Sequence, residues 1–244
     1  MDRGYAAPPP VAGGAVGSWE VTIVNAFMRR VYYWMAAGLS LSGAIAYLVL
    51  TSPAFMLLFF NPATGPTGLF WAALIGELVL VFAFIGLIKR VSVGVAMAMF
   101  IVYAALNGIT IGLVLLFYTG ASVVKTFLVT AGTFGAVSVW ASTTKKDLSA
   151  WGSFLFMGLI GVIIASLVNM FFRSPMMEWV ISIIGVIVFT GLTAYDTQKL
   201  RAMVLEAANE VTVSKMAVYG ALQLYLDFIN LFLFLLRLMG GGRD

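Results

Sequence analysis

The chain of 244 residues contains no cysteine and no histidine. Disulfides, thiolate chemistry and the common Cys/His zinc site are therefore excluded. Histidine is the side chain that ordinarily titrates near neutral pH, so any pH sensing here has to depend on carboxyl groups. Charged residues are scarce too, at 10% of the chain, whereas an average soluble domain has about 25%.

Hydrophobic residues, by contrast, are abundant and make up 62% of the sequence. A soluble fold must still show a polar surface to water and cannot absorb such an excess, whereas a lipid bilayer can. The net charge is +4, but the basic residues stand in pairs between apolar runs and form no continuous stripe. The expected partner is therefore the bilayer and not a nucleic acid.

Seven apolar runs follow one another, each close to the ~20 residues that span ~30 Å of hydrocarbon as a helix. They lie at about 31–52, 68–88, 91–117, 121–142, 151–172, 179–196 and 216–238. None alternates as a barrel strand would. The sequence predicts an all-α membrane protein with seven transmembrane helices in one domain, 21–244. Residues 1–20, rich in Pro, Gly and Ala, are expected to form a disordered tail.

Lysines and arginines in the short loops predict the orientation, because cytoplasmic loops carry an excess of them. With the N-terminus inside, ten of them face the cytoplasm: Arg3, Arg29, Arg30, Lys89, Arg90, Lys145, Lys146, Lys199, Arg201 and Lys215. Only four then lie toward the other side: Lys125, Arg173, Arg237 and Arg243. We therefore expect a cytoplasmic N-terminus and a C-terminus on the opposite side.

Three acids interrupt the apolar runs, although an ionised carboxylate in hydrocarbon is costly. Asp227 stands 12 residues after Lys215 and 10 before Arg237, near mid-membrane. Gln223 and Asn230 share its helical stripe at i−4 and i+3, which favours a functional site over a protonated Asp that only joins two helices.

The other two acids are less distinctive. Asp196 ends its run three residues before Lys199, so an interfacial carboxylate and a functional one are equally consistent with the spacing. Thr193 flanks it and is available for hydrogen bonding. Glu77 has no second polar residue on its stripe within two turns, which favours a neutral, protonated side chain.

Enzyme signatures are missing: the chain has no Gly-rich phosphate loop, GxSxG elbow or HExxH motif. Intramembrane aspartyl proteases resemble a YD…GxGD pattern. Tyr195 and Asp196 match its first half, but Asp227 stands in LYLDFINLF. We expect no enzymatic activity.

Small residues at helical spacing are expected to let helices approach closely in lipid. They are Ala131 with Gly135, Gly132 with Ala136, and Gly158 with Gly161.

Four segments together resemble the transmembrane Bax inhibitor motif family, in its bacterial branch. They are RRVYYWMAAGLSLSGAIAYLV (29–49), TTKKDLSAWGSFLFMGLIG (143–161), GLTAYDTQKL (191–200) and LYLDFINLFLFLLRL (224–238). The resemblance implies six helices around a central C-terminal one, in a bacterial inner membrane. It also implies a leak of calcium or other cations, a pH-sensing aspartate pair at Asp196 and Asp227, and a closed-state latch at Arg90, with Lys89 beside it.

The mechanism expected from this resemblance starts from two carboxylates that cannot both ionise cheaply when held close. With a shared proton they would form a hydrogen bond between the last two helices. When both ionise, they would separate or bind a cation, and calcium is the expected ion, with Gln223, Asn230 and Thr193 as supporting groups. No other cofactor is expected. The alternative is a membrane-embedded regulator of a protein partner, such as a membrane-bound AAA protease, with the N-terminal tail as its handle.

Overall fold

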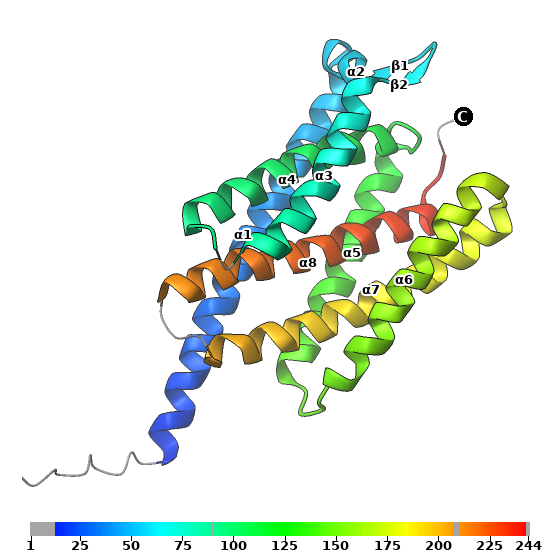
Figure 1. The fold of residues 1–244 in the computed structure, drawn as a ribbon. Coiled ribbons are helices and arrows are strands. Elements are labelled where there is room, and N and C mark those ends of the chain that lie inside the picture. Colours follow the sequence, from blue (N-terminus) through cyan, green and yellow to red (C-terminus); the bar gives the residue numbers. More distant parts are fainter. Residues whose placement is uncertain (1–12, 89, 207–209, 243–244) are drawn as a thin grey trace, which may run out of the picture.

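The computed structural model describes residues 13–88, 90–206 and 210–242 (Figure 1). Its elements, in chain order, are α1 Gly13–Thr51, α2 Pro53–Phe59, β1 Phe60–Asn61, β2 Gly65–Pro66, α3 Gly68–Leu87, α4 Val93–Leu115, α5 Gly120–Thr143, α6 Ser149–Phe172, α7 Pro175–Met203, the 3-10 turn η1 Val204–Glu206, and α8 Glu210–Met239. The two strands form a small antiparallel hairpin between α2 and α3.

Seven of the described helices are long and apolar enough to cross a bilayer, namely α1 and α3 to α8. The predicted all-α membrane fold with seven spanning helices is confirmed. Four of these helices begin directly after a Ser or Thr whose side chain accepts a hydrogen bond from a backbone N–H in the first turn, which satisfies an otherwise unpaired donor. These capping residues are Thr67, Ser92, Thr119 and Ser174.

Two helices are longer than their apolar runs. Helix α1 begins at Gly13, well before the run 31–52, so part of the segment expected as a tail is helical, while residues 1–12 lie outside the described residues. Helix α7 continues to Met203 and does not end at residue 196. Asp196 therefore lies two turns inside a helix, and the boundary predicted from hydropathy alone was wrong.

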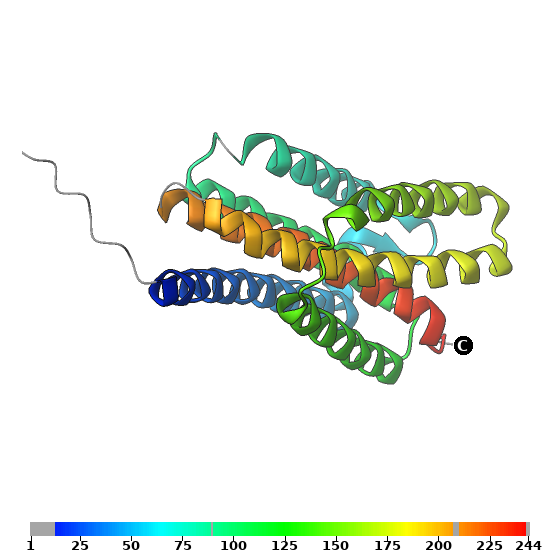
Figure 2. The ribbon, with the colours of Figure 1, turned by 90° about the horizontal axis from the view of Figure 1, so that it is seen from below.

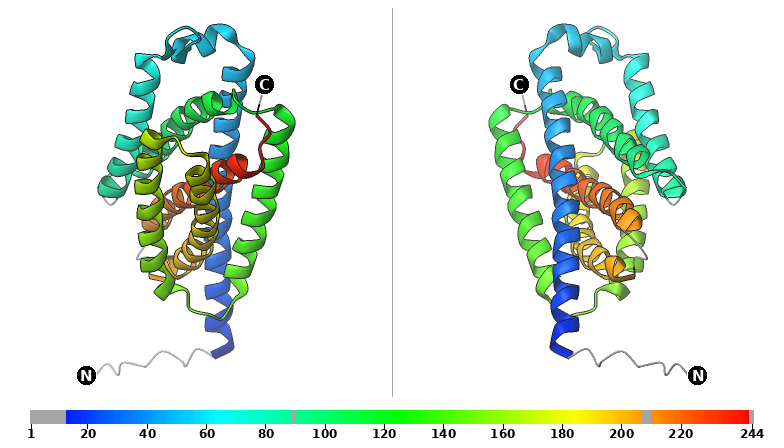
Figure 3. Two further views of the ribbon diagram at one scale, coloured as in Figure 1. Left: turned by 90° about the vertical axis from the view of Figure 1, so that its right-hand side faces the viewer. Right: turned by 90° about the vertical axis from the view of Figure 1, so that its left-hand side faces the viewer.

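Helix α8 is the central helix, as predicted. It packs against α1, α4, α5 and α7, and it contacts α3 where the ring of Tyr219 stacks on Phe84 at 6.4 Å. Figures 2 and 3 show α8 running through the middle of the bundle, with the other spanning helices around it. Leu224, Tyr225 and Leu236 on α8 are fully buried. An apolar helix buried on several sides is the expected core of such a bundle.

Helices α1 and α4 approach each other closely at two glycines, Gly108 and Gly112, that the sequence did not single out. A Cβ at Gly108 would lie 2.7 Å from the carbonyl oxygen of Ser42, and one at Gly112 would lie 2.8 Å from Val49 Cβ. By contrast, a Cβ at Gly132 would meet nothing within 4 Å. Gly135 and Gly161 are equally open, so the expectation of tight packing at these glycines was wrong. Of the four glycines in the predicted pairs, only Gly158 borders a neighbour, Val188.

Candidate functional site

A cavity of ≈ 950 Å³ lies between α3, α6, α7 and α8. Along α8 its lining extends from Tyr219 to Arg237, which corresponds to about 27 Å at 1.5 Å per residue. Most of the lining is apolar. Four of its polar members are Asp196, Gln223, Asp227 and Asn230. The cavity therefore brings the two predicted aspartates and both amides of the predicted stripe to one space.

One polar contact across the cavity shows the relative level of α7 and α8. Gln223 Nε2 donates to Asp196 Oδ1 at 3.5 Å, the long end of the hydrogen-bond range. Asp227 stands four residues beyond Gln223 on the same helix, so it lies about 6 Å deeper. The difference in depth that the sequence suggested is thus one helical turn, because α7 extends past Asp196 and runs antiparallel to α8 (Figure 1).

Asp227 is the least satisfied polar group of the cavity. Its residue is 4% exposed, and its Oδ2 has no hydrogen-bond partner in the described part of the chain. Gln223 Oε1 is likewise buried and unpartnered. A buried acceptor without a donor is expensive, so this carboxyl requires a proton, water or a cation.

No hydrogen bond joins the carboxyl groups of Asp196 and Asp227 within the described ranges. The shared-proton bond expected between them is therefore not present in this conformation. The polar contact between α7 and α8 at this level runs through Gln223 instead.

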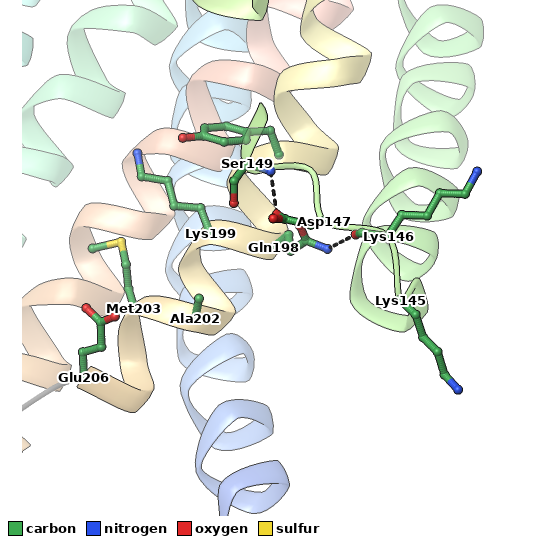
Figure 4. Close-up of a pocket in the computed structure, with 10 residues that line it drawn as sticks. Lys145, Lys146, Asp147, Ser149, Gln198, Lys199, Ala202, Met203 and Glu206 are labelled. Atoms are coloured by element: carbon green, nitrogen blue, oxygen red, sulfur yellow. Dashed lines mark hydrogen bonds between the residues drawn. The ribbon is translucent and has the colours of Figure 1, made fainter. Parts of the chain in front are cut away.

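One end of the cavity opens beside a second, more polar pocket of ≈ 420 Å³, shown in Figure 4. Tyr195 and Lys199 line both spaces. The ammonium of Lys199 lies 5.6 Å from the centroid of the Tyr195 ring, in a cation–π contact. Lys199 therefore places a positive charge where the two spaces meet.

The loop between α5 and α6 forms the rim of this second pocket and is fixed to α7. Gln198 Oε1 accepts from the N–H of Leu148, and Gln198 Nε2 donates to the carbonyl of Lys146, both at 2.8 Å. Hydrogen bonding by the side chain and backbone N–H of Ser149 lowers the pKa of Asp147 from its ordinary value. Asp147 is therefore charged at neutral pH, and the rim carries a fixed negative charge among its lysines (Figure 4).

The other predicted site residues lie in different places. Asn230 lines the cavity, while its Nδ2 donates to the carbonyl of Leu226 at 2.8 Å. Thr193 is fully buried, its hydroxyl donates to the carbonyl of Phe189, and it is not part of the cavity lining. The structure therefore does not bring Thr193 to the site.

Arg90 lies in the turn after α3, where it is exposed and its N–H donates to the carbonyl of Leu87. It forms no salt bridge with Asp196 or Asp227 among the residues that the structure describes. Lys89, expected beside it, lies outside those residues. A latch between Arg90 and the aspartates is thus not formed in this conformation.

Glu77 belongs to a separate polar cluster. Its Oε2 accepts from Asn107 Nδ2 at 3.0 Å, and its Oε1 accepts from Thr110 Oγ1 at 2.9 Å. Both partners are on α4, so the absence of polar neighbours on the stripe of Glu77 itself was misleading. The signal that could have found them is the pair Asn107 and Thr110, two polar residues at i and i+3 inside an apolar run.

Seven helices that are long and apolar enough to span a bilayer, four of which line a cavity with two acids, define a multi-pass integral membrane protein. The chain matches the family described as "Inhibitor of apoptosis-promoting Bax1" over residues 24–244, and it belongs to this family. The resemblance inferred from the sequence is thereby confirmed.

Relatives match along nearly their whole length. The inner membrane protein YbhL of Escherichia coli (strain K12) is 45% identical over 222 residues, which cover 90% of this chain and 93% of that protein. An uncharacterized protein of Borreliella burgdorferi is 44% identical over 227 residues, covering 92% and 96%. An uncharacterized protein of Caulobacter vibrioides is 41% identical over 254 residues, covering 100% and 99%.

Proposed function

We propose that the protein is a pH-sensitive leak pathway for cations, with calcium as the ion, in the bacterial inner membrane. Asp196 and Asp227 are the ion-binding, pH-sensing pair in this proposal, which assigns no catalytic chemistry to them. The observation that carries it is the unpartnered carboxyl oxygen of Asp227, buried in a cavity shared with Asp196 and Gln223.

The donor set of the cavity suits a weak calcium site. Calcium takes six to eight oxygen ligands. Asp196 and Asp227 supply carboxylates, Gln223 Oε1 and Asn230 Oδ1 supply amide oxygens, and water completes the shell. No group of three or more acids that could hold a metal occurs among the described residues. A site with only two charges binds a cation without trapping it, and conduction requires an ion to leave as well as to enter.

The orientation of the pathway follows from the charge bias of the loops. With the N-terminus in the cytoplasm, the mouth lined by Tyr195 and Lys199 faces the cytoplasm. Most of the cavity lining beyond this mouth is apolar and excludes most water, so only a few water molecules and ions reach Asp196 and Asp227.

Purified protein in liposomes tests this function directly. The wild type alone should release calcium from loaded liposomes, and Asp227→Asn, which keeps shape but removes one charge, should reduce the rate roughly ten-fold or more, a factor that corresponds to about 1.4 kcal/mol. Glu210→Gln is the matched control, because Glu210 is an exposed acid that lines neither this cavity nor the pocket beside it.

A wild-type protein that releases no calcium would contradict the leak proposal. It would favour the alternative, a membrane-embedded regulator of a protein partner, which need not conduct ions by itself. An Asp227→Asn variant that conducts like the wild type would show that Asp227 takes no part in the ion pathway.

A further inference from the structure

Helix α8 is held on its other side by a buried hydrogen-bond network centred on Tyr225. The Tyr225 hydroxyl donates to Asn107 Oδ1 on α4 at 2.7 Å, and it lies 2.7 Å from Ser42 Oγ on α1. Asn107 in turn donates to Glu77 on α3. Tyr225 is fully buried and Ser42 is 2% exposed. The Tyr225 hydroxyl thus connects the central helix directly to α1 and α4, and Asn107 extends the network to α3.

The network has a defined direction. Tyr225 donates its single O–H to Asn107 Oδ1, and Asn107 Nδ2 donates to Glu77 Oε2. One amide group therefore joins the tyrosine to the acid, with its oxygen toward Tyr225 and its nitrogen toward Glu77.

Tyr225 and Asp227 are two residues apart, which places them about 200° apart around α8. The network consequently holds one face of α8 while Gln223, Asp227 and Asn230 present the opposite face to the cavity. We propose that Tyr225 is a positioning residue that sets the rotation of α8 and so aims Asp227 into the cavity. The inference rests on the proposed function in treating Asp227 as the ion site.

Rotation of α8 would break this arrangement. It would leave the Tyr225 hydroxyl and Asn107 Oδ1 short of partners in an apolar interior, which is unfavourable. Ser42 Oγ would keep the carbonyls of Gly38 and Ala104. The Tyr225 ring is held separately, by edge contacts with Phe100 and Tyr103 at 5.8 Å each. Tyr225→Phe therefore removes the hydrogen bonds and keeps the ring packing.

The chain has no cysteine, so a single introduced one reports on a single position. Leu226→Cys on α8 and Leu192→Cys on α7 both lie at the cavity lining. We expect Tyr225→Phe to raise the rate at which a small water-soluble thiol reagent labels Leu226→Cys about five-fold or more, since the loss of even one hydrogen bond shifts a two-state population by about this factor. Labelling of Leu192→Cys should stay within two-fold.

Tyr103→Phe is the matched control. Its ring belongs to the same cluster, but in the described structure its hydroxyl makes no hydrogen bond. An unchanged rate at Leu226→Cys, an equal rise at Leu192→Cys, or the same rise with Tyr103→Phe would each overturn the proposal.

A flux assay in liposomes separates this proposal from the proposed function. Labelling depends on the position of α8 and not on conduction, so a protein that releases no calcium would contradict the leak function and leave the positioning role of Tyr225 intact. In that flux assay, Tyr225→Phe should change the leak about five-fold and have no effect in an Asp227→Asn background.

Discussion

The side-chain amide of Gln223 lies 3.5 Å from the carboxyl of Asp196, which places Asp196 one helical turn from the level of Asp227. Both acids line the same cavity, and no direct hydrogen bond joins them in the described structure. The contact gives Gln223 two tasks, because its N–H positions Asp196 while its unpartnered Oε1 is available to a cation.

Two substitutions of Gln223 should therefore change the calcium affinity in opposite directions. Gln223→Ala removes a ligand and the contact to Asp196, and it should weaken calcium binding about five-fold, the factor expected for about 1 kcal/mol. Gln223→Glu adds a third carboxylate to the cavity and should strengthen binding at neutral pH. Calcium titration of the purified protein measures both. Equal affinities for the wild type and the two variants would show that calcium binds elsewhere.

Sequence alone predicted the spanning helices and the stripe of Gln223, Asp227 and Asn230, because both depend on periodicity within one helix. It did not predict the partners of Glu77, since contacts between helices depend on their relative rotation and level, which no single run encodes. The position of Asp196 was misjudged for a related reason: hydropathy drops at residue 196, but α7 continues to Met203 as a helix with polar residues.

Close packing between α1 and α4 predicts unequal effects of adding one methyl group. Gly108→Ala should lower the thermal unfolding temperature in detergent, because the new Cβ would lie 2.7 Å from the backbone oxygen of Ser42, and overpacking typically costs about 1–3 kcal/mol. Gly132→Ala adds the same group to a spanning helix with nothing within 4 Å. Its unfolding temperature should match or exceed that of the wild type. Equal destabilisation by both would refute the packing argument.

The proposed orientation can be tested on intact cells with single cysteines. Ala63→Cys lies in the exposed β1–β2 turn, and Lys145→Cys lies in the exposed loop between α5 and α6. A membrane-impermeant thiol reagent should label Ala63→Cys and spare Lys145→Cys until the cells are opened, because the charge bias places the N-terminus inside. The reverse pattern would invert the topology and turn the Lys199 mouth outward.

The pH dependence of calcium binding by the aspartate pair tests the central claim most directly. Protons and calcium compete for the same oxygens, so the calcium affinity of the wild type should fall as pH is lowered. Asp227→Asn and Asp196→Asn should each weaken binding and flatten this dependence, and the double variant should add little, because the two acids act as one site. Single variants that keep both the affinity and the pH dependence of the wild type would contradict the account, and Glu77 would then be the acid to test.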